Sequence, residues 1–144
     1  DLADVRRLTV ANEGMVDIGR ISDLSGIEDL DFSLNRIADI APLGDLGKLV
    51  ILNLSDNQVS DLAPLGDLRG LQFLTLANNE VKSLKPLANL HSLQGLILSG
   101  NQIRDLSPLL KLKSLRTLSL KGNPIPKDEI KRLRKALPKC VISF

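Results

Sequence analysis

Few residues in this chain of 144 could carry out covalent chemistry. It has one histidine, His91, and one cysteine, Cys140, which excludes a zinc site built from several Cys and His side chains. A nucleophilic triad would need His91, but the surrounding phrase NLHSL predicts an exposed turn residue. Cys140 continues an apolar pattern, so we expect a buried small side chain and not a reactive thiol.

Paired carboxylates are the other candidate for chemistry. Asp29 and Asp31 would point the same way on a strand, as a general acid and base must. On an open surface, however, nothing would raise the pKa of either carboxyl group. The phrase SDNQVSD does not have the spacing of an EF-hand, and no glycine-rich phosphate loop with a lysine is present. We therefore expect no enzyme, no small-molecule substrate, no metal and no cofactor.

One phrase recurs at a constant interval along the chain. Residues 53–68 read NLSDNQVSDLAPLGDL, and residues 75–90 read TLANNEVKSLKPLANL. Asparagine returns at Asn35, Asn57, Asn79, Asn101 and Asn123, and leucine returns at Leu30, Leu52, Leu74, Leu96 and Leu118. The pattern L-x-x-L-x-L-x-x-N at a period of roughly 20–29 residues is the signature of a leucine-rich repeat.

The repeat predicts a stacked fold, because a single unit cannot bury its own apolar side chains. The L-x-L segment alternates as a short strand does, and the proline of each repeat suits the first position of a helical turn. The fold class is an α/β leucine-rich repeat: a right-handed parallel β-solenoid of about six 22-residue units with 3₁₀ or turn segments on the convex side. The five asparagines should satisfy backbone groups of adjacent turns, which is a structural role.

We expect a single domain over residues 1–144. Residues 1–23 form a first, atypical repeat without a helical N-terminal cap, and Glu13 stands where asparagine is expected. Residues 24–122 are regular repeats, and residues 123–144 are a C-terminal cap made of a helix, PKDEIKRLRKALP, and a strand, CVISF. One further period of the repeat places Cys140 at the position of Leu118, and Ile142 at that of Leu120.

The outer, concave surface of the sheet, called the sheet face below, is the candidate binding site. Most of its outward positions are small and polar, but Ile51, Phe73 and Ile97 are apolar and lie on consecutive strands. An exposed apolar cluster with a polar rim is typical of a protein-binding hot spot. The predicted partner-binding residues are Ile51, Phe73 and Ile97, with Asn53, Gln72, Thr75 and Gln94 as the rim and Asp29 and Asp31 on the N-terminal side.

Charge is unevenly distributed along the chain, which suggests an alternative site. Residues 1–103 hold 8 basic and 14 acidic side chains, whereas residues 104–144 hold 11 basic and 3 acidic ones. Lys131, Arg132, Arg134 and Lys135 lie on the predicted cap helix and could bind an anionic surface, either nucleic acid or membrane. Nucleic acid is the less expected partner, because no aromatic residues are interleaved with these cations.

The phrases ADIAPL, SDLAPL, KSLKPL and RDLSPL resemble the 22-residue repeats of bacterial internalin-type leucine-rich repeat proteins. The segment GNPIPKDEIKRLRKALPKCVISF is similar to a C-terminal cap of such proteins. This resemblance covers essentially the whole chain. It implies a protein-binding module of the kind found on secreted or cell-surface proteins, although the chain itself has no targeting signal. The period is also similar to that of eukaryotic phosphatase-regulatory repeats, but the Pro-Leu phrase fits the bacterial type better.

The sequence thus favours a monomeric, non-catalytic module that binds a protein or peptide through the sheet face. An alternative is a structural repeat segment of a larger or engineered protein, with no ligand of its own. No apolar run approaches the roughly 20 residues of a membrane span.

Overall fold

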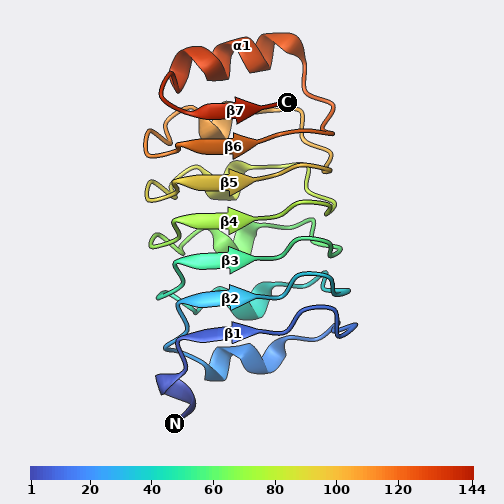
Figure 1. The fold of residues 1–144 in the computed structure, drawn as a ribbon, viewed down its shortest axis with the longest axis vertical. Coiled ribbons are helices and arrows are strands. Elements are labelled where there is room, and N and C mark those ends of the chain that lie inside the picture. Colours follow the sequence, from blue (N-terminus) through green and yellow to red (C-terminus); the bar gives the residue numbers. More distant parts are fainter.

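Seven short strands stack in chain order into one parallel sheet in the computed structural model, which describes residues 1–144 (Figure 1). The strands are β1 (Arg7–Thr9), β2 (Asp29–Asp31), β3 (Ile51–Asn53), β4 (Phe73–Thr75), β5 (Gly95–Ile97), β6 (Thr117–Ser119) and β7 (Val141–Ser143). From β1 to β6 each residue pairs with its equivalent in the next repeat, as Leu30 does with Leu52. The predicted parallel β-solenoid is confirmed.

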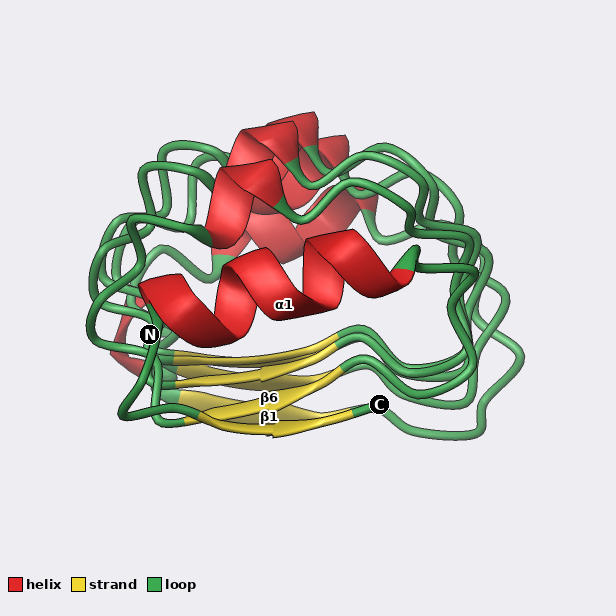
Figure 2. Cartoon of the chain, turned by 90° about the horizontal axis from the view of Figure 1, so that it is seen from above, coloured by secondary structure: helices red, strands yellow, loops and turns green.

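Short 3₁₀ segments form the side opposite the sheet, as Figure 2 shows in a view along the stack. They are η2 (Gly19–Asp23), η3 (Ala41–Leu43), η4 (Ala63–Leu65), η5 (Lys85–Leu87) and η6 (Ser107–Leu109), and a further one, η1 (Leu2–Asp4), precedes β1. Proline lies at the start of η3 to η6, where its fixed φ suits the turn. In η3, Asp39 accepts a hydrogen bond from the backbone N–H of Ala41 at 2.9 Å, and Asp61 and Asp105 bond the corresponding groups of η4 and η6.

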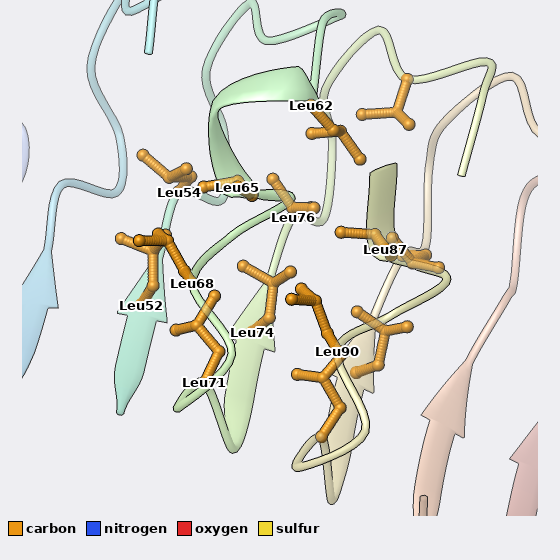
Figure 3. Packing of buried hydrophobic residues seen from close by; sticks show 14 of the residues in the cluster. Leu52, Leu54, Leu62, Leu65, Leu68, Leu71, Leu74, Leu76, Leu87 and Leu90 are labelled. Carbon is orange, nitrogen blue, oxygen red and sulfur yellow. The ribbon is translucent and has the colours of Figure 1, made fainter. Parts of the chain in front are cut away.

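The core lies between the sheet and the 3₁₀ segments. One cluster of 35 buried hydrophobic residues runs through it. In Figure 3, Leu52 and Leu74 from adjacent strands gather with Leu65 and Leu87 from the opposite side, and no polar atom lies among the side chains drawn. Burying each such leucine stabilises the fold by roughly 1.5–3 kcal/mol. The stacked columns of these buried residues, called the leucine ladder below, therefore hold the strands in a fixed register.

Asparagine side chains tie neighbouring repeats together. The Oδ1 atom of Asn57 accepts a hydrogen bond from the N–H of Ile37 at 2.9 Å, in the preceding repeat. Its Nδ2 donates to the carbonyl oxygen of Phe32, also in the preceding repeat, and to those of Leu54 and Ser55. Asn35, Asn79, Asn101 and Asn123 repeat this arrangement. No buried side-chain nitrogen or oxygen lacks a partner, so these amides fully occupy their hydrogen-bonding capacity within the scaffold.

The residue before each of these asparagines, and before Glu13 in the first repeat, has a positive φ. The column consists of Asn12, Leu34, Asp56, Asn78, Gly100 and Gly122, with φ between 56° and 72°. Glycine and asparagine adopt this left-handed conformation readily, but a leucine pays a steric cost for it. Leu34 is nevertheless 52% exposed and contributes nothing to the core.

The C-terminal cap contains α1 (Lys127–Ala136), which covers the last rung of the core (Figure 2). Leu133 is fully buried, and Glu129 accepts a hydrogen bond from the N–H of Leu106 at 2.9 Å. The predicted register of the last strand is wrong by two positions, because Leu118 pairs with Ile142 and not with Cys140. The ten-residue α1 replaces a three-residue 3₁₀ segment, and the longer connection moves the strand two positions along the chain.

Candidate functional site

The three apolar residues predicted on the sheet face lie on β3, β4 and β5, in two columns. Ile51 pairs directly with Phe73, and their side chains are 37% and 44% exposed. Ile97 lies in the next column, where it pairs with Thr75, and it is half-buried. The apolar surface is therefore a diagonal band across three strands, with Phe73 at its centre.

Gly95 opens a hollow beside Phe73. Gly95 pairs with Phe73, and a Cβ atom placed on Gly95 would lie 3.0 Å from the Phe73 Cδ1 atom. The phenyl ring thus leans over the space that a side chain would fill. Phe73, Gln94, Ile97 and Arg116 line an open depression of about 330 Å³ here, called the Gly95 hollow below. An apolar side chain of a partner would meet a phenyl ring and an isoleucine in this hollow.

The predicted rim divides into residues occupied by the scaffold and residues that are available. Asp29 forms an ion pair with Arg7 at 2.7 Å, so its charge is largely compensated. Asp31 and Asn53 each accept a hydrogen bond from the backbone N–H two positions later, at 2.9 Å and 3.0 Å. The side chains of Gln72, Thr75 and Gln94 make no hydrogen bond within the chain, and Gln94 lines the Gly95 hollow.

Sequence reasoning missed one apolar residue of this surface. Val141 pairs with Thr117 on β6, so it stands in the same column as Phe73 and Ile51. It is 73% exposed. The error in register did not turn this residue inward, because a shift of two positions leaves each side chain on the same face of the sheet. The alternation of the phrase CVISF, with Ile142 facing the core, therefore already indicated that Val141 points outward, but the predicted cluster included only residues of the regular repeats.

The predicted basic patch on α1 is partly engaged within the chain. Arg132 pairs with Glu129 at 3.2 Å, and the Arg134 guanidinium lies 4.8 Å from the centre of the Phe144 ring. Lys131 and Lys135 are exposed and have no carboxylate partner. The patch is thus less positive than the sequence suggests.

A second group of cations shares only Lys135 with the predicted patch. Lys113, Arg116, Lys135 and Lys139 line an open depression of about 400 Å³ where the chain enters β6 and β7, called the basic hollow below. No acidic side chain lines it. Cys140 also lines it and is half-buried, not fully buried as expected; burial raises the pKa of its thiol, and the nearby Arg116 partly opposes this.

The positions of the side chains support neither the nucleophilic triad nor the metal site that the sequence analysis considered. His91 is exposed in a turn, away from Cys140 in the chain and in the repeat stack. No three His, Cys, Asp or Glu side chains come together as a metal site would require. None of the helices has the length and apolar character needed to cross a membrane.

Two stretches of the chain, residues 47–89 and 91–135, match a family model described as leucine-rich repeats in two copies. Together they make up more than half of the chain. The chain belongs to the leucine-rich repeat family. Members of this family commonly act as protein-binding modules, and they are generally non-enzymatic. No protein of curated function matches the chain in sequence.

Three solved structures similar to this chain come from two bacteria. A leucine-rich repeat protein from Leptospira interrogans is 32% identical, with a TM-score of 0.92. An internalin (inlF) and an internalin C2 (inlC2) from Listeria monocytogenes are 26% and 31% identical, with TM-scores of 0.74 and 0.75. The predicted resemblance to internalin-type proteins is confirmed. The matches cover 98–99% of this chain but only 37% of the Leptospira chain, 48% of inlF and 71% of inlC2.

Proposed function

We propose that this chain is a non-catalytic module that binds a protein or peptide segment through its sheet face. One observation carries the proposal: Phe73 and Ile51, paired on adjacent strands, expose large apolar side chains at the middle of a sheet whose other outward residues are mostly polar or small. A fold that only needed to be soluble would gain nothing from this arrangement. Aromatic residues that become fully covered supply much of the free energy of typical protein interfaces.

The scaffold favours such binding because it is already ordered. The asparagine bonds and the leucine ladder hold the strands rigid before a partner arrives, so association costs little backbone entropy. Binding would remove the apolar side chains of Ile51 and Phe73 from water, which favours association. The side chains of Gln72, Thr75 and Gln94 retain free polar groups that can select a partner. Ile97 and the Gly95 hollow make this surface uneven, whereas the rest of the sheet is flat.

The test compares two matched substitutions on the purified chain. A displayed library of random peptides is selected on the wild-type chain, and the selected peptides are titrated against Phe73→Asp and Val16→Asp. Both substitutions place a carboxylate at an exposed apolar position, but Val16 lies in a loop outside the sheet. We expect Phe73→Asp to abolish binding and Val16→Asp to leave it unchanged, with the same circular dichroism spectrum in all three proteins.

Two results would contradict the proposal. If no peptide is enriched on the wild-type chain above its level on a surface without protein, the chain does not bind such segments, and a purely structural repeat is favoured. If peptides bind but tolerate Phe73→Asp, binding occurs elsewhere, and the basic residues of α1 become the next candidate.

A further inference from the structure

The Gly95 hollow and the basic hollow share one residue, Arg116. Its side chain lines both depressions, so the apolar and cationic surfaces form one continuous path from β4 toward β7. The Arg116 backbone N–H bonds the carbonyl oxygen of Gln94, which fixes the base of the side chain next to the Gly95 hollow. The Arg116 Nη1 atom donates to the carbonyl oxygens of Lys113 and Leu115, at 2.9 Å and 3.1 Å. These bonds hold the guanidinium at the junction.

The positive charge at this junction is not compensated within the chain. Lys113 donates to the carbonyl oxygen of Ala136 at 2.6 Å, and no ion pair of the structure includes Lys113, Arg116, Lys135 or Lys139. At the opposite end of the same sheet edge, Arg6 does have a carboxylate partner, Glu28, at 3.5 Å. Lys48 and Arg69, before β3 and β4, are also exposed and form no ion pair, but they lie singly. At the C-terminal end of this edge, four such cations line one hollow that has no acidic side chain.

We propose that the segment bound by the sheet face is acidic and carries one protruding apolar side chain. The apolar side chain enters the Gly95 hollow, beside Phe73 and Ile97. A carboxylate of the same segment pairs with Arg116, and following carboxylates lie over Lys139 and Lys113. This inference rests on the proposed function and adds the chemical class of the partner to it.

The geometry also sets the spacing between the two anchors. Phe73 on β4 and Arg116 at the entrance to β6 are separated by two inter-strand steps, which amount to roughly 10 Å. An extended chain covers this distance in about three residues. The first carboxylate should therefore lie about two to four positions from the apolar residue.

The first test is the composition of the peptides selected from the random library on the wild-type chain. We expect enriched sequences to share an apolar residue with Asp or Glu about two to four positions away. Enriched sequences that depend on Phe73 but are neutral or basic would overturn this inference and leave the proposed function standing. A selection without any Phe73-dependent peptide would overturn both.

The second test titrates one selected peptide against single variants by fluorescence anisotropy. Arg116→Gln should weaken binding about tenfold, since a charge-assisted hydrogen bond contributes on that order. Because Arg116 also bonds two backbone carbonyls, Lys139→Gln is the independent check: its side chain has no bond within the chain, and we expect a loss of about threefold. Gly95→Val should weaken binding by more than tenfold, because the valine side chain would fill the hollow and displace the Phe73 ring.

Lys131→Gln is the matched control, because it removes one exposed lysine from α1 outside the basic hollow. It should change the affinity by less than about twofold. The peptide with Gln in place of its acidic residues should bind the wild-type chain more weakly than the original peptide binds Arg116→Gln, because it also loses its contacts with Lys139 and Lys113. Equal losses for Lys131→Gln and Arg116→Gln would overturn the inference, because they would indicate general attraction to a basic surface.

Discussion

Leu34 is the residue at which the repeat conflicts most plainly with local backbone preference. Its φ of 59° is left-handed, whereas the equivalent positions of other repeats hold Asn, Asp or Gly. A left-handed conformation costs an ordinary residue roughly 1–2 kcal/mol. Because Leu34 is exposed, replacing it loses little burial. We expect Leu34→Asn to raise the free energy of unfolding by about 1 kcal/mol in urea titrations.

Gly100 lies in an equivalent turn, and a substitution there should have the opposite effect on stability. Its φ is 69°, and an added Cβ atom would collide with the side-chain amide of Asn78. Gly100→Ala should therefore lower the stability by about 1 kcal/mol or more. If Leu34→Asn instead destabilised the chain, the strain would be offset by contacts of the leucine side chain, and this account of the turn would be wrong.

At the scale of residues, the sequence allowed part of the candidate site to be predicted. Ile51 and Phe73 could be placed outward, because the repeat fixes the alternation of each strand. The charge of Asp29 is compensated by Arg7, and this ion pair depends on side-chain positions that the repeat period does not encode. The same is true of the Gly95 hollow, which comes from the lean of one phenyl ring. A glycine in the sequence does not by itself predict a hollow, because the hollow depends on the side chain of the neighbouring strand.

At the scale of elements, the 3₁₀ segments are held by aspartates at their starts. Asp105 accepts a hydrogen bond from the N–H of Ser107 at 2.8 Å. Hydrogen bonds from the hydroxyl and backbone of Ser107 lower the pKa of the Asp105 carboxyl below its ordinary value of 3.8, helped by the charges of Arg132 and Lys85. The charged form therefore stabilises the folded state, fully above pH 3.8, and this contribution is lost as the pH falls through the lowered pKa.

We expect Asp105→Ala to cost about 0.5–1 kcal/mol at pH 7, a small value because the carboxylate is almost fully exposed. The stability difference from the wild-type chain should narrow below pH 3.8. Ser83→Ala is the control, since Ser83 occupies the equivalent position with an uncharged hydroxyl at a longer 3.4 Å. Urea titrations at several pH values measure both. A difference for Asp105→Ala that stays constant down to low pH would exclude a role for the charge.

The elements themselves were the most predictable part of the fold. Columns that return once per repeat place five strands beside each other without further information, and the helix of the cap follows from its apolar face around Leu133. The register of β7 was not predictable by the same rule. The length of the path around an α-helix differs from that around a 3₁₀ turn, and the periodicity ends where the cap begins.

At the scale of the whole molecule, the chain is a one-dimensional stack. Each strand contacts only its neighbours in the sheet, and α1 packs on η6 at the C-terminal end. At the N-terminal end, an open apolar hollow of about 420 Å³ is lined by Leu8, Val10 and Phe32, among others. Stability in such a stack is carried by interfaces between adjacent repeats. The two ends should therefore open more readily than the middle.

Leu133→Asp tests this picture, because it places a charge in the fully buried contact of α1 with the last repeat. Hydrogen exchange of backbone amides should accelerate most in β6 and β7, while β3 and β4 keep most of their protection. Lys131→Asp, on the exposed side of the same helix, should change little. Equal loss of protection in all seven strands would show that the stack unfolds as one unit.

The central claim is that the sheet face, not the basic helix, is the binding surface. The most direct measurement is a ¹H–¹⁵N NMR titration of the ¹⁵N-labelled chain with a peptide selected on it. The account predicts that the largest shift changes fall on amides of β3 to β6 and on Arg116, with α1 residues 131–134 nearly unchanged. Changes confined to α1, with the strands unaffected, would contradict it.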